Sequence, residues 1–177
     1  MAPGPTGEPA MHIFGLTGRR GSGKTTLMIK LVPELTGRGF SVSAVEHAHP
    51  PFDIDRPGKD SYRHRAAGAA EVMVASAKRW ALIHAHHGAS GPGIDDLMAH
   101  LTPVDLLIAE GFTRESHPKI EVHRPAQGQP PLCANQPHIV AVASDAPVDG
   151  LDVPVLDLGD IASIGDFIVD YCGLEAD

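Results

Sequence analysis

The amino-acid sequence predicts an α/β fold in which a mainly parallel sheet carries helices on both faces. Short apolar runs alternate with segments of helical periodicity along most of the chain, a pattern typical of parallel strands joined by crossover helices. Residues 106–109 are continuously apolar, as expected of a central strand that is covered on both faces. The 177 residues suffice for one hydrophobic core, so we expect a single domain over 11–174 behind a disordered tail at 1–10.

Apolar spacing and turn residues place the elements in the first half of the chain. A glycine-rich loop separates a short apolar run from a segment whose leucines recur at every fourth residue, so a strand is followed by a helix. Pro33 is expected to kink this helix because it removes a backbone donor, and Gly37 with Gly39 to end it. In chain order we expect a strand at 13–16, this helix from 24, a strand at 42–46, a helix at 60–69 and two paired strands at 71–76 and 79–85.

The second half of the chain shows the same alternation of strand and helix signals. Its central strand ends at Glu110 and Gly111, and Asp160 is expected to cap the last helix, whose isoleucines share one face. The stretch between residues 124 and 137 is rich in proline and glutamine and is predicted to be a surface loop. In chain order we expect a helix at 95–101, a strand at 105–109, an edge strand at 119–123, strands at 139–143 and 153–158, and a helix from 161 to 171.

Charge and composition exclude several classes of partner. The net charge of −8 has the wrong sign for a protein that neutralises many phosphates along a nucleic acid. No run approaches the roughly 20 apolar residues of a membrane span, and the first residues lack the features of a signal peptide. We therefore expect a cytoplasmic protein with no nucleic-acid and no membrane partner. Cys133 and Cys172 belong to no metal-ligand spacing, which favours two reduced structural thiols.

A phosphate-binding loop is predicted in the segment GRRGSGKTT, which fits the pattern G-x-x-x-x-G-K-[ST]. Its glycines allow successive N–H groups to turn toward an anion, and the helix that starts at Lys24 adds partial positive charge there. Lys24 supplies an ammonium for the outer phosphates and Thr25 a hydroxyl for Mg²⁺. The predicted strand before the loop and helix after it indicate a three-layer P-loop NTPase fold. The predicted nucleotide-binding residues of this loop are Gly18, Arg20, Gly21, Ser22, Gly23, Lys24, Thr25 and Thr26.

Several charged residues have two interpretations. Arg19 and Arg20 either reach a phosphate or are solvated. Glu110 is the best candidate for holding the metal together with Thr25, since open parallel sheets bind ligands beyond the carboxyl ends of their strands. The alternative is that Glu110 is an ordinary exposed glutamate. Asp53 and Asp55 lie in the long loop that follows the second strand, where they either meet the metal or are ordinary loop acids.

Asp145 is the predicted guanine-reading residue, because it follows a strand whose carboxyl end shares a sheet edge with the phosphate loop. Its carboxylate would accept hydrogen bonds from the N1–H and the 2-amino group of guanine, whereas adenine presents an acceptor at N1. The alternative is that Asp145 only starts the turn before Pro147.

Histidine spacing leaves a transition-metal site open as an alternative. His47 and His49, and later His84, His86 and His87, have conceivable ligand spacing, but no cysteine or carboxylate completes a tetrahedral set near them in the sequence. Structural roles are therefore favoured for these histidines.

Several segments together resemble the MobB family, the molybdopterin-guanine dinucleotide biosynthesis adaptor proteins, from about His12 to Tyr171. These segments are GRRGSGKTTL, EHAHPPFDIDRPGKDSYRHRAAGA, ASAKRWALI, DLLIAEGF with KIEVHR, and AVASDAP. The resemblance implies a homodimeric P-loop GTPase that acts beside a MobA-like molybdenum cofactor guanylyltransferase, the enzyme that joins GMP to molybdopterin. It also implies that residues 21–26 hold the phosphates of GTP, that Thr25 and Glu110 serve Mg²⁺, and that Asp53 lies in a switch-like loop.

Two positions depart from the family pattern. Glu46 stands where the family often has lysine, and Arg20 keeps the charge of a lysine.

Three functions remain open at the level of the sequence. The first is an adaptor that binds GTP and hydrolyses it slowly or not at all. The second is a small-molecule P-loop kinase, for which Arg63 and Arg65 are the only lid-like feature. The third is a metal-delivery GTPase of metallocentre maturation, which the 11 histidines favour. A kinase consumes nucleotide only with its acceptor present, a metal-delivery protein retains a transition metal, and an adaptor does neither.

Overall fold

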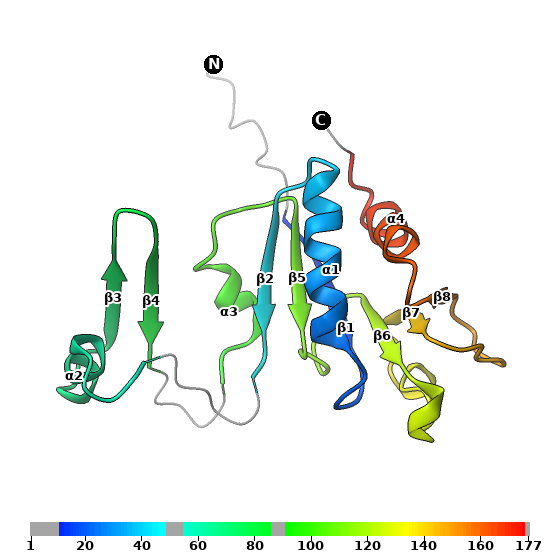
Figure 1. Cartoon of the computed structure of the whole chain (residues 1–177), viewed down its shortest axis with the longest axis horizontal. Helices are drawn as coiled ribbons and strands as arrows, with labels where there is room; N and C mark the ends of the chain where they lie inside the picture. The colour runs from blue at the N-terminus through cyan, green and yellow to red at the C-terminus, as the bar shows by residue number, and fades with distance from the viewer. Residues whose placement is uncertain (1–10, 49–54, 86–90, 176–177) are drawn as a thin grey trace, which may run out of the picture. The chain divides into compact units, whose positions relative to one another are not determined.

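A computed structural model describes residues 11–48, 55–85 and 91–175 (Figure 1). The chain divides into two compact units, one formed by residues 1–47 with 101–177 and the other by residues 48–100. The expected single domain over 11–174 stays a prediction, and the expected tail at 1–10 lies outside the described residues. No helix within the described ranges is long and apolar enough to cross a membrane.

The first unit contains a six-stranded sheet in which all neighbouring strands are parallel. Its strands are β1 (His12–Thr17), β2 (Val42–Glu46), β5 (Leu106–Glu110), β6 (Lys119–His123), β7 (Ile139–Ser144) and β8 (Val155–Asp157). They lie in the order β2-β5-β1-β6-β7-β8. The predicted α/β fold with a mainly parallel sheet and flanking helices is therefore confirmed.

Two long helices, α1 (Lys24–Gly37) and α4 (Ile161–Cys172), pack against one face of this sheet and against each other (Figure 1). The aromatic ring of Phe14 in β1 meets Phe167 and Tyr171 of α4 edge-on. Helix α1 includes Pro33, where the predicted kink stays a prediction, and it ends at Gly37, as predicted. The Asp160 carboxylate accepts a hydrogen bond from the Ser163 N–H at 3.0 Å, which confirms the predicted cap of α4.

Strand β6 lies between β1 and β7, so its prediction as an edge strand is wrong. The polar residues Lys119, Glu121 and His123 suggested an exposed strand, but all three are buried. They alternate with Ile120 and Val122 of the core, and therefore point to the opposite face of the sheet. Loop backbone covers them there and supplies hydrogen-bond partners, which is why a central strand tolerates this pattern.

The connections place a topological switch point at β1. From β1 the chain crosses to β2 at one edge and returns through β5, whereas β6, β7 and β8 follow one another on the other side of β1. The loops after β1 and β6 therefore leave the sheet in opposite directions, and ligands of open α/β sheets bind at such a crevice. The phosphate-loop segment is the one that follows β1.

The second unit contains an antiparallel hairpin and two short helices. These elements are α2 (Asp60–Ala66), β3 (Glu71–Ala75), β4 (Trp80–His84) and α3 (Ile94–Met98). The two predicted strands and their pairing are confirmed. Helix α2 ends three residues before the predicted boundary, because Gly68 adopts a left-handed φ of 100° that stops the helix. The short 3₁₀ helices Pro125–Gln127 and Cys133–Asn135 lie in the predicted surface loop of the first unit.

Candidate functional site

The loop between β1 and α1 has a backbone that only glycine accommodates. Gly18, Gly21 and Gly23 have φ values of 140°, 77° and 105°, in the region that other residues rarely adopt. A Cβ atom at Gly18 would also lie 2.4 Å from the carbonyl oxygen of Val122. The loop thus turns tightly against β6 before α1 begins at Lys24, which is the geometry of an anion-binding loop at a helix N-terminus.

The ammonium of Lys24 is folded back over this loop. Its Nζ donates to the carbonyl oxygens of Gly18 at 3.1 Å and Arg19 at 3.2 Å. Because these are uncharged acceptors, they leave the positive charge uncompensated and available to an anion. The cation is therefore held within the loop, where the outer phosphates of a nucleotide are expected.

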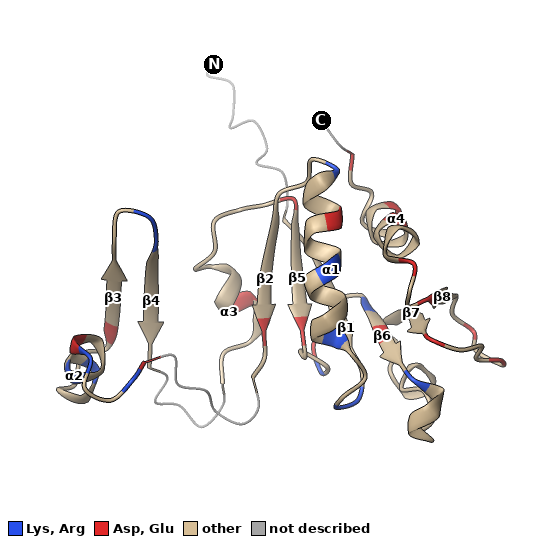
Figure 2. Ribbon diagram, viewed as in Figure 1, with Lys and Arg blue, Asp and Glu red and all other residues tan. Residues whose placement is uncertain are grey.

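Two residues from different elements meet beside the loop. The hydroxyl of Thr25, at the start of α1, donates to Oε1 of Glu110 at 2.8 Å, although 85 positions separate them in the sequence. Glu110 is the last residue of β5 and is buried. Basic residues of the phosphate loop and acidic ends of β2 and β5 gather at this edge of the sheet (Figure 2). Hydroxyl and carboxylate oxygens are ligands that suit Mg²⁺, so the pair fits the metal that the sequence predicts.

The loop after β6 supports the phosphate loop from one side. Arg124 donates from Nε to the Ser22 carbonyl at 2.8 Å, and Gln127 donates from Nε2 to the Arg20 carbonyl at 3.4 Å. In return, Arg19 donates from Nη2 to the Pro130 carbonyl at 3.2 Å. The Arg19 guanidinium therefore has a structural partner. The Arg20 side chain is exposed, and its phosphate contact stays a prediction.

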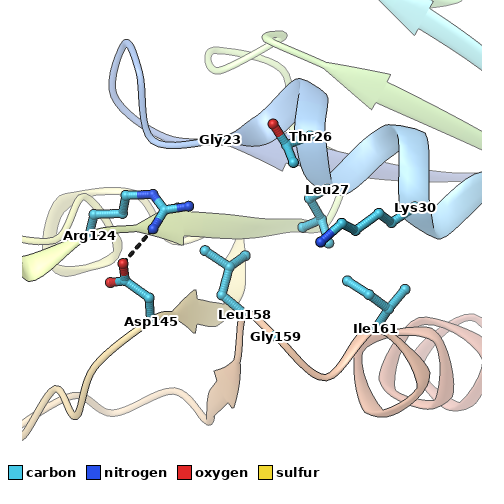
Figure 3. A pocket seen from close by; sticks show the side chains of 9 residues that line it. All are labelled: Gly23, Thr26, Leu27, Lys30, Arg124, Asp145, Leu158, Gly159 and Ile161. Atoms are coloured by element: carbon cyan, nitrogen blue, oxygen red, sulfur yellow. Dashed lines mark hydrogen bonds and ion pairs between the residues drawn. The ribbon is translucent and has the colours of Figure 1, made fainter.

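A pocket of about 210 Å³ opens next to the phosphate loop (Figure 3). Asp145 and Arg124 form an ion pair at one side of it, and Lys30 extends from α1 toward the pocket on the other side. Ser144 makes a turn with Ala146, and the carboxylate of Asp145 within this turn faces Arg124 at the edge of the pocket. The lining residues are Gly23, Thr26, Leu27, Lys30, Arg124, Asp145, Leu158, Gly159 and Ile161.

Residues 13–145 match the family described as MobB, molybdopterin guanine dinucleotide synthesis protein B. The chain belongs to the MobB family. A molybdopterin-guanine dinucleotide biosynthesis adapter protein from Escherichia coli is 38% identical over 168 residues, covering 93% of this chain and 95% of that protein. A protein of the same name from Haemophilus influenzae is 38% identical over 161 residues, covering 90% and 88%. The crystal structure of a MobB protein homolog from Bacillus stearothermophilus matches with a TM-score of 0.69 at 25% identity, covering 93% of this chain and 100% of that one.

The loop that is predicted to be switch-like is described only in part. Asp53 lies outside the described residues, so its predicted metal contact stays a prediction. Asp55 is buried in the second unit, where it accepts hydrogen bonds from Ser61 at 2.7 Å and from Arg65 at 3.3 Å. Arg63 pairs with Asp60 at 3.7 Å on the surface. Both arginines that the sequence suggested as a kinase lid therefore contact acidic residues of the second unit.

The histidines that the sequence singled out have other neighbours. The His47 ring packs on Phe112 with centroids 5.1 Å apart, and His84 contacts Glu71 at 2.8 Å. His49, His86 and His87 lie outside the described residues. Within the described ranges, no group of three or more histidine, cysteine, aspartate or glutamate residues is placed to hold a metal ion. Cys133 and Cys172 are free thiols, as predicted.

A buried basic pair lies on the face of the sheet away from α1. Lys119 donates from Nζ to the carbonyl oxygens of Glu115 and His117, and burial lowers its pKa to about 8. Burial, followed by the charge of Lys119, lowers the pKa of His117 to about 4. Both ring nitrogens of His117 lack a hydrogen-bond partner among the described residues. The pair fixes the loop that follows Glu110 to the sheet.

Sequence reasoning missed six of the nine residues that line the pocket, among them Arg124, Lys30 and Leu158. Arg124 directly follows a buried strand at the edge that carries the phosphate loop, which is a usable signal in retrospect. Lys30 stands one helical turn after Thr26 and so shares its face of α1. Leu158 precedes the cap of the last helix, and its place in the pocket depends on strand order, for which the sequence offers no signal.

Proposed function

We propose that this MobB family member is a GTP-binding adapter of molybdopterin guanine dinucleotide biosynthesis. It assists a MobA-like guanylyltransferase in attaching GMP to molybdopterin, and hydrolyses GTP slowly or not at all. One observation carries the proposal: the glycine loop with Lys24, the Thr25–Glu110 pair and the Asp145 pocket all adjoin one crevice at the carboxyl edge of the sheet. They supply, in order, partners for phosphates, for Mg²⁺ and for a base.

The phosphate and metal assignments are supported by the chemistry of the groups present. The loop N–H groups and Lys24 would bind the triphosphate, and Thr25 and Glu110 would hold Mg²⁺. The metal would neutralise phosphate charge when bound. Asp53 is proposed as a further residue near this metal from its place in the sequence.

The pocket supports guanine as the base. Its volume of about 210 Å³ is smaller than the roughly 300–1,000 Å³ of pockets that enclose whole ligands, so it suits one part of a nucleotide. Leu27, Leu158 and Ile161 provide apolar walls for a flat ring. Asp145 would accept from N1–H and the 2-amino group, and the Lys30 ammonium suits the O6 carbonyl of guanine. Adenine instead presents an acceptor at N1 and a donor at its 6-amino group.

The family and the second unit support the adapter role and a homodimer. Relatives that are 38% identical over most of their length carry the name adapter protein. The hairpin of the second unit exposes Met73 and Trp80 with 61% and 62% of their surface accessible. A two-stranded hairpin has marginal stability in water by itself, so an apolar hairpin surface favours association with a second copy.

Two measurements test the proposal. Isothermal titration with GTP and ATP, each with and without Mg²⁺, should show Mg²⁺-dependent binding that prefers GTP. Co-purification with the guanylyltransferase should then be stronger with GTP than without it. A protein that binds neither nucleotide, or that consumes nucleotide rapidly only when an acceptor molecule is added, would contradict the adapter assignment.

A further inference from the structure

We propose that Arg124 determines the base specificity of the nucleotide site by positioning the Asp145 carboxylate. The inference rests on the proposed function, because it concerns how the same site distinguishes guanine from other bases. Arg124 is the first residue after β6, and Asp145 the first after the neighbouring strand β7. The two side chains therefore meet at the crevice beside the phosphate loop.

The Arg124 guanidinium makes two hydrogen bonds in the site and lies close to Gly23. Its Nε donates to the Ser22 carbonyl at 2.8 Å, and its Nη1 pairs with Oδ2 of Asp145. Its Nη2 lies 3.3 Å from the position that a Cβ atom at Gly23 would occupy. Because the guanidinium is planar and rigid, the contact with Ser22 fixes the direction of the contact with Asp145. The phosphate loop thereby sets the orientation of a carboxylate on another strand.

Asp145 needs such a support to discriminate between bases. Its side chain is 38% exposed and it stands at the start of a turn, so by itself its carboxylate would rotate and be solvated. Arg124 takes part of the hydrogen-bonding capacity of Oδ2 and leaves Oδ1 and further lone pairs for a base, since a carboxylate has about four acceptor sites. A carboxylate that is fixed in place disfavours a base that presents another acceptor, such as adenine. A mobile carboxylate can rotate away from that base at little cost and so discriminates less.

A purely structural role for Arg124 makes a different prediction, and Gln127 provides the comparison. Gln127 supports the phosphate loop through the Arg20 carbonyl at 3.4 Å, but it does not line the Asp145 pocket. Loss of loop support weakens the binding of every nucleoside triphosphate alike, because all carry the same phosphates. Loss of Asp145 positioning weakens GTP alone.

The experiment is isothermal titration of wild type, Arg124→Gln and Arg124→Lys with GTP, ATP and inosine triphosphate, at constant Mg²⁺. We expect Arg124→Gln to reduce GTP affinity about tenfold to thirtyfold and ATP affinity less than about threefold, the usual effect of losing one charge-assisted contact. Arg124→Lys keeps the positive charge but not the planar guanidinium, so its preference for GTP over ATP should lie between those of wild type and Arg124→Gln. Inosine triphosphate lacks the 2-amino group, so Arg124→Gln should reduce its affinity less than it reduces that of GTP.

Two further variants separate the possible outcomes. Gln127→Ala should lower GTP and ATP affinity by the same factor. In an Asp145→Ala background, Arg124→Gln should leave the GTP-to-ATP ratio unchanged, because the two residues act through one contact. An equal loss for GTP and ATP in Arg124→Gln would overturn the inference while the proposed function stands. A wild-type protein without GTP preference would instead contradict the proposed function itself, and circular dichroism confirms that each variant is folded.

Discussion

Lys24 is the residue whose loss should affect phosphate binding most directly. Its Nζ is held by two neutral carbonyl groups of the loop, so its charge is available to a bound triphosphate. Lys24→Ala should weaken GTP binding by about 1.5 to 3 kcal/mol, or roughly tenfold to a hundredfold, with an unchanged fold. Titration calorimetry measures the affinity. Lys78→Ala in the exposed hairpin turn is the control, and equal affinities in wild type and Lys24→Ala would contradict the phosphate assignment.

Glu110 should be required for the metal response and not for folding. In Glu110→Gln the amide oxygen still accepts the 2.8 Å hydrogen bond from Thr25, so thermal stability should change by less than about 1 kcal/mol. The negative charge that is proposed to bind Mg²⁺ is lost. GTP binding by the variant should therefore no longer depend on Mg²⁺ concentration. A wild-type Mg²⁺ response in Glu110→Gln would exclude this carboxylate as a ligand.

Asp145 provides a test of base identity by exchange of donor and acceptor. An asparagine at 145 offers one acceptor and one donor, which suits xanthine because its C2 carries a carbonyl group in place of the amino group. Asp145→Asn should therefore bind GTP about tenfold or more weakly and xanthosine triphosphate more tightly than wild type. Titrations with both nucleotides decide the matter. If neither affinity changes, Asp145 serves only the turn that follows β7.

The loop between β5 and β6 should make the free energy of unfolding depend on pH. His117 has a pKa of about 4 in the folded chain, below its ordinary value of 6.5. Between these values the unfolded chain binds a proton that the folded chain excludes, so stability falls as pH decreases from about 6.5 to 4. The loss is on the order of 3 kcal/mol.

His117→Phe removes this titration and should flatten the dependence. Urea unfolding of wild type and variant at pH 7 and pH 4.5 measures it, with exposed His64→Gln as the control that keeps the wild-type slope. Identical slopes in wild type and His117→Phe would show that His117 does not carry the acid sensitivity. Lys119 has a lowered pKa of about 8 in the folded chain. Between this value and its ordinary value of 10.5 the unfolded chain keeps a proton that the folded chain has lost, so stability again rises with pH.

The hairpin of the second unit is expected to hold two copies of the chain together. Met73 pairs with Leu82 and Ala75 with Trp80, so Met73 and Trp80 lie on one face of the hairpin. We predict a homodimer at micromolar concentration, and a monomer for the double variant Met73→Glu with Trp80→Glu. Sedimentation equilibrium measures the mass with and without nucleotide.

A matched control for the dimer lies in the first unit. Ile29 is 69% exposed on α1, so Ile29→Glu adds the same charge at an apolar surface residue and should leave the mass unchanged. A monomeric wild type, or a double variant that remains dimeric, would exclude the hairpin as the interface.

The phosphate loop and the periodic helices and strands were predictable because interactions between neighbouring residues specify them. Glycine spacing and the start of a helix specify the phosphate loop within a few residues, because positive φ angles and helix N-termini are local properties. Residue periodicity likewise predicted α1, β5 and the hairpin of the second unit, since periods of 3.6 and 2 reflect which side of an element is buried. The position of Glu110 followed from the same reasoning, as the end of an apolar strand.

Which of these residues meet depends on the order of strands in the folded sheet. Thr25 contacts Glu110 across 85 positions and Arg124 contacts Ser22 across 102, and both contacts depend on the order of strands in the sheet. That order also made β6 a central strand with buried Lys119 and Glu121, against its polar composition. Periodicity along a chain records whether a side chain is covered, but not which distant segment covers it, because pairing between strands is set by the packing of the whole sheet.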